Sequence, residues 1–374
     1  MVRMRPLRFL TLLLAIAVLA GAAGSPAYFA YIGTYTGHGS QGIYAYRFEP
    51  ATGALTSLGL AAQTENPSFL AAGPGGTYLY AVNENEVGSV SAFRIDRKTG
   101  KLTPLNSIST SGSSPCALAV NYSGRFVLAA NYGSGSVSLF PIKADGSLAP
   151  ASAFNHHNGS GVNPQRQAGP HAHSASFSPD DRFAFSADLG VDLIYIYGFD
   201  AKRGTLTTVG YGHVTPGSGP RHLAFHPNGK LVYAIDELAA TVSAFAWREG
   251  VLKPITAVST LPPAYRGPKS GAEIGVHPNG RFLYASNRGQ ANNIAIFYVD
   301  PQTGKLTPAG HVPSGGMTPR SFSIDPSGQY LFVANQDSDN VVVFHIDPKT
   351  GQLTQTGKTL AVSAPVAVQF VAAE

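Results

Sequence analysis

Cysteine is almost absent from this chain of 374 residues, and the single Cys116 cannot form a disulfide bond within one molecule. Its neighbours in the segment 115–118 are apolar. We therefore interpret Cys116 as a small buried residue rather than a reactive thiol. Motifs for common chemistries are also missing, since there is no GxSxG, HExxH, CxxC or GxxxxGK. A covalent serine hydrolase is not expected, and we predict neither a cofactor nor a bound metal.

Charged residues are scarce, at 13% of the chain, and we find a long apolar run only near the N-terminus. Three arginines precede the apolar segment 9–19 and small residues follow at 20–22, so we predict a signal peptide over residues 1–23. A retained N-terminal anchor is the alternative, although the segment is short for a membrane span. Without these arginines the formal net charge falls from +5 to +2, and no Lys/Arg cluster is left. We expect an exported, periplasmic or extracellular monomer without nucleic-acid binding or stable membrane association.

Glycine, proline and aromatic residues are plentiful, which suits many short strands joined by tight turns. A glycine followed two residues later by leucine recurs at intervals of 46 to 58 residues. It occurs at Gly53, Gly100, Gly146, Gly204, Gly250, Gly304 and Gly351. Seven such copies predict one repeat domain over residues 24–374 instead of two or three separate domains.

Each copy has the pattern of four short strands, which in the fifth copy are predicted at 221–225, 231–235, 241–247 and after Gly250. Four-stranded units of this length form β-propellers, in which each sheet packs against its neighbours and no long edge stays open. A linear β-solenoid is the alternative. Residues 28–34 match the second strand of the unit and residues 366–371 match its first strand, which favours a closed ring. We predict an all-β, seven-bladed β-propeller whose last blade is closed by the N- and C-terminal strands.

Two charges distinguish the fifth copy from the others. Arg221 lies about as far before the turn at Asn228 as Glu237 lies after it, so a hairpin would bring them together. Corresponding positions in other copies hold further polar residues, which we expect around one mouth of the central channel. These are Glu84, His173, Arg288, Arg320 and Gln336, with Glu273 projecting nearby. Several such groups at one mouth favour a functional site over isolated rim ion pairs.

Asn or Asp recurs just before these turn positions, at Asn83, Asn131, Asp188, Asp236, Asn287 and Asn335. We predict that it caps the following turn, with a ring of metal ligands as the alternative. His171 and His173 are also candidate metal ligands, but no third ligand has a useful spacing. His226 and His277 occupy matched HPNG turns and are expected to be structural.

Two insertions, 153–169 and 261–269, interrupt the repeat between the last strand of one copy and the first strand of the next. Irregular loops on one face of a rigid ring usually mark the binding face. We expect both on the face that carries Arg221 and Glu237, with a tolerated surface insertion as the alternative.

Longer motifs resemble the seven-bladed propeller lactonase family, which includes bacterial 6-phosphogluconolactonases of the propeller type and a fungal carboxymuconate cyclase. They run through the whole mature chain, as YIGTYT at Tyr31, NPSFLA at Asn66, GPHAHS at Gly169, GPRHLAFHPNG at Gly219, AEIGVHPNGRFLYASNRG at Ala272 and TPRSFSIDPSGQYLFVANQ at Thr318. The resemblance implies a catalytic group of His173, Arg221, Glu237 and Arg288 at the channel mouth. His171, Glu273, Arg320 and Gln336 are the candidates for substrate binding.

Three features depart from the typical pattern of this family. Asp236 replaces an asparagine before Glu237, and His171 is an additional histidine. The signal peptide contrasts with the cytoplasmic location of sugar-phosphate metabolism. This last departure questions a phosphorylated substrate more than it questions lactone chemistry.

The favoured hypothesis is metal-independent hydrolysis of a sugar-acid lactone. Arg221 and Arg288 would stabilise the oxyanion or bind a substrate carboxylate or phosphate. Either His173 or Glu237 would take the proton of the attacking water, and His173 is favoured because Arg221 should lower the pKa of Glu237. Two alternatives stay open: a non-catalytic exported propeller that binds a ligand or protein, and a metal-dependent lactonase that uses the Asn and Asp ring.

Overall fold

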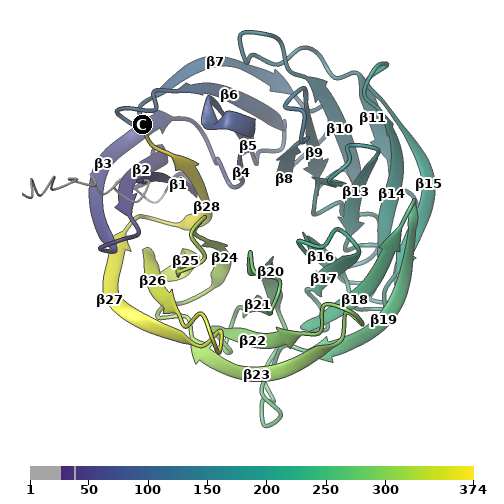
Figure 1. Ribbon diagram of the computed structural model, residues 1–374. Coiled ribbons are helices and arrows are strands. Elements are labelled where there is room, and N and C mark those ends of the chain that lie inside the picture. The colour runs from purple at the N-terminus through teal and green to yellow at the C-terminus, as the bar shows by residue number, and fades with distance from the viewer. Residues whose placement is uncertain (1–26, 38) are drawn as a thin grey trace, which may run out of the picture.

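The computed structural model describes residues 27–37 and 39–374, and the signal peptide predicted at 1–23 lies outside this part. Within the described residues, the strands form seven four-stranded sheets. Figure 1 shows these sheets as blades around a central channel, with the chain running once around the ring. The predicted seven-bladed all-β propeller is confirmed, and the solenoid alternative is wrong. No helix in the described residues has the length and apolar character needed to cross a membrane.

The blades are numbered here along the chain, and each is given from its inner to its outer strand. Blade 1 contains β28 (Pro365–Ala372), β1 (Tyr28–Thr34), β2 (Gly42–Glu49) and β3 (Ala54–Gln63). Blade 2 contains β4 (Leu70–Ala72), β5 (Tyr78–Asn83), β6 (Ser89–Ile95) and β7 (Leu102–Ser109), and blade 3 contains β8 (Pro115–Val120), β9 (Phe126–Asn131), β10 (Ser136–Pro141) and β11 (Ala153–His156). Blade 4 contains β12 (Ser176–Phe177), β13 (Phe183–Asp188), β14 (Leu193–Asp200) and β15 (Thr205–His213), and blade 5 contains β16 (Pro220–Phe225), β17 (Leu231–Asp236), β18 (Thr241–Arg248) and β19 (Val251–Ser259). Blade 6 contains β20 (Gly271–Val276), β21 (Phe282–Asn287), β22 (Asn293–Val299) and β23 (Leu306–Pro313), and blade 7 contains β24 (Pro319–Ile324), β25 (Tyr330–Asn335), β26 (Asn340–Ile346) and β27 (Leu353–Ala361). Two short 3₁₀ helices occupy Pro74–Gly76 and Gln336–Ser338.

Blade 1 joins the two ends of the repeat domain. Strand β28 pairs antiparallel with β1, from Tyr28 opposite Ala372 to Thr34 opposite Pro365. In Figure 1 the yellow C-terminal strand lies against the purple N-terminal strands. The predicted closure of the ring by both ends is confirmed.

The repeated glycine has a structural reason in the contact between neighbouring blades. The hydroxyl of Tyr233 donates a hydrogen bond to the carbonyl of Gly304 in the next blade at 3.2 Å, and Tyr284 does the same to Gly351 at 2.8 Å. Both glycines have a left-handed φ, +74° and +70°, which other residues adopt at a cost. A Cβ would also lie 2.7 Å from Leu231 at Gly304 and 2.5 Å from Phe282 at Gly351, so the turn packs too closely on its neighbour for a side chain.

The HPNG turns connect blades in a similar way. Nε2 of His226 lies 2.8 Å from the carbonyl oxygen of Gly280, and Nε2 of His277 lies 2.7 Å from that of Gly328. The structural role predicted for these two histidines is confirmed.

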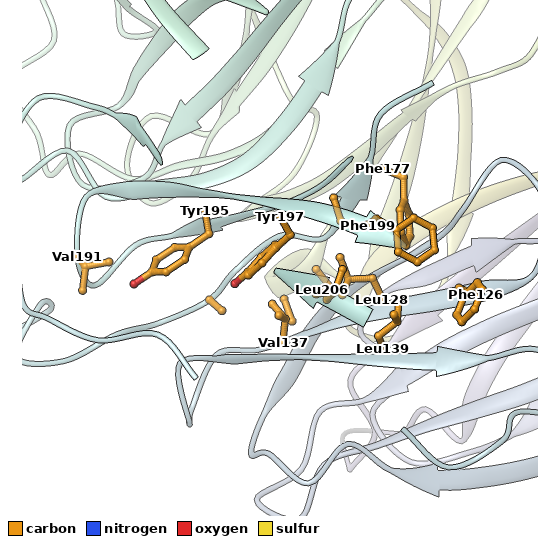
Figure 2. Close-up of a cluster of buried hydrophobic side chains, with 14 residues drawn as sticks. Phe126, Leu128, Val137, Leu139, Phe177, Val191, Tyr195, Tyr197, Phe199 and Leu206 are labelled. Atoms are coloured by element: carbon orange, nitrogen blue, oxygen red, sulfur yellow. The ribbon is translucent and has the colours of Figure 1, made fainter. Parts of the chain in front are cut away.

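Apolar side chains fill the space between blades. Figure 2 shows one such cluster, where Phe126 and Leu128 of blade 3 pack with Tyr197 and Phe199 of blade 4. Full burial of an apolar side chain of this size stabilises a fold by about 1.5–3 kcal/mol. Because similar clusters recur around the ring, the inner strands form a rigid wall around the channel.

The first predicted insertion has different bounds in the structure. Residues 153–156 are β11, the outer strand of blade 3, which pairs with β10. The segment after Gly146 forms only an isolated bridge, between Ile142 and Leu148, so the outer strand comes later in the chain than in other blades. The insertion itself therefore covers residues 157–169.

Candidate active site

In several blades, the inner strand contains one residue that has no pairing partner in the neighbouring strand. In β16, Pro220 pairs with Asp236 and His222 pairs with Ile235, so Arg221 forms a β-bulge. Cys116 in β8 and Arg320 in β24 hold the same position. A bulge redirects one side chain and often lies beside an active site. Figure 1 shows the strands that carry these residues around the central channel.

The carboxylate of Glu237 contacts three arginines. Oε1 accepts a hydrogen bond from Nη2 of Arg166 at 2.7 Å. Oε2 lies 2.8 Å from Nη2 of Arg288 and 3.3 Å from Nε of Arg221. Burial by itself would raise the pKa of Glu237, but the charges of Arg288, Arg221 and Arg166 outweigh it and lower the pKa to about 2. Glu237 is therefore ionised at neutral pH and held in one position.

Arg221 is a buried cation behind this carboxylate, only 2% exposed. Its Nη1 donates a hydrogen bond to the carbonyl of Ala272 at 2.6 Å. Burial is the largest cause that lowers the pKa of Arg221, and the charges of Arg288 and Arg320 lower it further, to about 10. The guanidinium still carries its charge at neutral pH, so it supplies a fixed positive group next to the channel mouth.

His173 lies at the same level on blade 4 and is buried. Burial, and then the charges of Arg221, His222 and Arg320, lower the pKa of His173 well below its ordinary value. The imidazole is therefore neutral at neutral pH. Its Nδ1 lies 3.5 Å from Sγ of Cys116, whose own pKa is raised by burial. The predicted burial of Cys116 is confirmed, and the thiol is protonated.

A second ion pair lies close to this group, since, besides burial, the charge of Arg320 helps to lower the pKa of His173 and Arg221. Arg320 lies 3.8 Å from Oε2 of Glu84, and its guanidinium stands over the ring of Tyr35 at 5.2 Å. The hydroxyl of Tyr35 donates a hydrogen bond to the same carboxylate oxygen at 2.8 Å. Glu84 is thus held by Tyr35 and Arg320 together.

These groups surround one cavity of about 240 Å³, called here the mouth pocket. It is lined by Tyr35, Glu84, Cys116, Tyr132, Arg166, His173, Glu237, Arg288 and Arg320. A larger cavity, of about 600 Å³, lies on the loop 258–269 and includes no carboxylate. The convergence of charges makes the mouth pocket the candidate active site.

The other predicted site residues lie around this pocket without lining it. His171 stacks on Tyr132 with ring centroids 4.4 Å apart, and its Nδ1 lies 3.0 Å from the carbonyl oxygen of Tyr132. Glu273 follows Ala272 in β20, and its Oε1 lies 2.9 Å from Nδ1 of His222. Gln336 lines a separate neighbouring cavity. Of the eight candidates, His173, Glu237, Arg288 and Arg320 line the pocket, and Arg221 supports it from behind through Glu237.

Sequence reasoning did not place four residues of the mouth pocket there, namely Tyr35, Cys116, Tyr132 and Arg166. Arg166 comes from the insertion 157–169, and Tyr35 and Tyr132 follow β1 and β9. The insertion was expected on this face, but its composition did not show that Arg166 reaches Glu237. The second insertion, 261–269, contributes no residue to the mouth pocket and lines the larger cavity instead.

The Asn and Asp residues before the turns each make hydrogen bonds within the protein, while Oδ1 of Asn131, Asp236 and Asn335 is buried without a hydrogen-bond partner in the described part of the chain. Asn131 donates hydrogen bonds to the hydroxyls of Ser136 and Ser138, both at 3.1 Å. Asp236 accepts hydrogen bonds from the equivalent Thr241 and Ser243, both at 2.7 Å. These contacts hold the turn that follows each strand. Among the described residues, no three His, Cys, Asp or Glu side chains are grouped so as to hold a metal ion.

Comparison with known proteins gives consistent matches over this whole region. A family model described as "Lactonase, 7-bladed beta-propeller" matches residues 29–370. The 6-phosphogluconolactonase of Bacillus subtilis is 39% identical over 92% of this chain and 98% of its own length. That of Formosa agariphila is 38% identical over 83% and 90%. The periplasmic gluconolactonase of Pseudomonas aeruginosa has a solved structure with a TM-score of 0.89 at 34% identity, over 93% of this chain and all of that chain.

Proposed function

The chain belongs to the seven-bladed β-propeller lactonase family, and from this we propose that it hydrolyses a sugar-acid lactone at the mouth pocket. The reaction adds water to the ring carbonyl and breaks the bond between that carbon and the ring oxygen. The ring oxygen takes a proton and becomes a hydroxyl, and the product is an open-chain carboxylic acid that releases a proton near neutral pH. Such a reaction needs a base for the water and a positive group for the oxyanion.

The single observation that carries the proposal is the position of Glu237 among Arg166, Arg221 and Arg288 in the mouth pocket. With a pKa of about 2, this carboxylate is a weak base. It orients the arginines instead. Arg288, which is partly exposed to the pocket, is the donor best placed for the developing oxyanion.

His173 is the general base in this proposal. It lines the pocket and is neutral at neutral pH, so that it can accept a proton from water. The positive charges of Arg221 and Arg320 that lower its pKa also assist its later deprotonation. No metal is required for any of these steps.

The charge of the pocket suits a phosphate on the substrate or the carboxylate of the product. Arg166, Arg288 and Arg320 line it, against the carboxylates of Glu84 and Glu237. A guanidinium binds carboxylate and phosphate well because its geometry allows two parallel hydrogen bonds. The Bacillus subtilis relative is named for a phosphorylated lactone and the Pseudomonas aeruginosa relative for gluconolactone. We propose that the protein acts as an exported monomer on one of these two kinds of lactone.

The test is a pH-stat assay near pH 6.5, where the uncatalysed reaction is slow, with glucono-δ-lactone and its 6-phosphate. Turnover of at least one lactone is expected, unchanged by a chelator. Absence of turnover with both, combined with binding of the open-chain acids, would favour a non-catalytic binding protein. Loss of turnover in chelator, restored by calcium or zinc, would contradict the metal-independent mechanism.

A further inference from the structure

We propose that a second cavity beside the mouth pocket is a subsite for a neutral sugar unit attached to the lactone. This cavity, called here the side cavity, has a volume of about 500 Å³. It is lined by Tyr35, Thr36, Asn66, Gln336, Asp337, Asp339 and Ala364. The proposal rests on the proposed function and extends it to a substrate class, the lactones of disaccharide acids.

The two cavities share Tyr35. This side chain lines both of them, and it is fixed on the mouth side by its hydrogen bond to Glu84 and by Arg320 over its ring. A substrate whose lactone ring occupies the mouth pocket would extend past Tyr35 to reach the side cavity. Aromatic faces commonly support apolar surfaces such as those of a sugar ring.

The charges of the two cavities are opposite. The mouth pocket has three lining arginines, whereas the side cavity has two aspartates and no cation in its lining. Within the described residues, neither Asp337 nor Asp339 takes part in a salt bridge with Lys, Arg or His. A phosphate or carboxylate would be repelled there. Hydroxyl groups would be accepted, because a carboxylate offers about four acceptor positions and no donor.

The lining is held in place by contacts of its own. Oδ1 of Asp337 accepts a hydrogen bond from Nε2 of Gln336 at 3.0 Å, and Oδ2 accepts one from the hydroxyl of Thr318 at 2.5 Å. Oδ1 of Asp339 accepts the backbone N–H of Ala364 at 2.7 Å. The acceptor groups are thus positioned before a ligand arrives, which reduces the entropy lost on binding.

The volumes fit a ligand of two rings. The side cavity is about twice as large as the mouth pocket, and their combined size is within the usual range of about 300–1,000 Å³ for small-molecule sites. The mouth pocket alone is below this range. A lactone ring in the mouth pocket and a neutral sugar in the side cavity would use both.

The experiment compares two lactones, glucono-δ-lactone and the δ-lactone of cellobionic acid, in which a glucose is attached to the same ring. We expect wild-type protein to have a lower KM for the disaccharide lactone. Asp337→Ala should raise that KM about tenfold through loss of a charge-assisted hydrogen bond, while leaving both kinetic constants for glucono-δ-lactone within about twofold. Glu86→Ala is the matched control, because Glu86 is an exposed carboxylate in the corresponding turn of blade 2.

Equal KM values for the two lactones, or an equal effect of Asp337→Ala on both, would overturn the subsite. Calorimetric titration with cellobionate and gluconate separates this result from a failure of the proposed function, since it needs no turnover. Weaker binding of cellobionate alone in Asp337→Ala supports the subsite even if neither lactone is hydrolysed. Calcium binding that depends on Asp337, with no discrimination between the two sugars, would replace the subsite with a cation site.

Discussion

Arg221 and Glu237 lie at the start of one hairpin arm and just after the end of the other, and their side chains meet with Nε 3.3 Å from Oε2. Both side chains are buried, so water cannot solvate either charge. A buried pair of this kind depends on further partners, which here are Arg166 and Arg288 for the carboxylate and the carbonyl of Ala272 for the guanidinium. The pair thus positions Arg166 and Arg288, the two arginines of the mouth pocket that contact Glu237.

The first prediction concerns this pair. Glu237→Gln removes the charge that holds three arginines together, and Arg221→Ala removes the cation behind it. Each is expected to lower kcat/KM by at least 100- to 1,000-fold, because fixed groups in the mouth pocket are displaced. Circular dichroism should show an intact propeller. Glu86→Gln is the control, and near-normal turnover in Glu237→Gln would remove this residue from the mechanism.

The second prediction concerns pH. Burial and the charges of Arg221, His222 and Arg320 lower the pKa of His173, so the neutral base persists below pH 6.5. The acid limb of the kcat/KM profile should therefore lie well below pH 6.5. His173→Gln should lower kcat by about 10²–10⁴-fold, with exposed His345→Gln as control. A limb at or above pH 6.5 would contradict a neutral, low-pKa base.

A third prediction separates Cys116 from the chemistry. Burial raises the pKa of its thiol, so the reactive thiolate is absent at neutral pH. Cys116→Ser should keep kcat/KM within about threefold, and iodoacetamide should not inactivate the native protein. Mass spectrometry after treatment in urea provides the positive control for labelling. Rapid inactivation of the folded protein would show that the thiol is exposed and reactive.

Fourth, Asp236→Asn should stabilise the protein at high pH. Burial raises the pKa of Asp236 to about 7, against about 3.9 in an unfolded chain. Between these values the folded state keeps a proton that the unfolded state has lost, so this group makes the free energy of unfolding fall as pH rises. Asparagine does not titrate and matches Asn131 in blade 3. We expect a gain of about 1–3 kcal/mol at pH 8 that disappears below about pH 4. An equal effect at both pH values, in denaturant unfolding, would contradict this assignment.

The fifth prediction concerns Arg166, whose side chain is 43% exposed although it contacts buried Glu237. Because Arg221 and Arg288 still pair with Glu237 when Arg166 is removed, Arg166→Ala should lower the unfolding midpoint only slightly. It should raise KM about tenfold if the guanidinium binds an anionic substrate. Arg182→Ala removes an exposed arginine that pairs with Asp180 and should change neither value. Identical kinetics in the two variants would exclude Arg166 from substrate binding.

The fold was predictable because the same contacts recur in each blade. The carbonyl of Gly304 accepts a hydrogen bond from the hydroxyl of Tyr233, and the ring of His226 lies within hydrogen-bond distance of the carbonyl of Gly280. Because the same contact is made between other pairs of blades, it requires the same residue types at regular intervals along the sequence. The number of blades therefore followed from the spacing of the repeat, and the closure followed from the match of residues 28–34 and 366–371 to the second and first strands of the unit.

The site was only partly predictable, because position along a strand does not give the direction of a side chain. Counting from the turns put Gln336 at the channel mouth with Arg221, yet Gln336 lies outside the mouth pocket. The bulges could not be counted, since one extra residue changes which side chains face the channel. Arg166 was missed because an irregular loop has no period from which to place it.

Strand β28 also bears on when the molecule can fold. Its residues are synthesised after every other strand, while its partner β1 is made first and must wait with an unpaired edge. The nascent chain can build six complete sheets, but the ring stays open until translation reaches residues 365–372. Closure of the disc therefore comes last, and until then the unpaired edge of β1 is open to pairing with another copy of the chain.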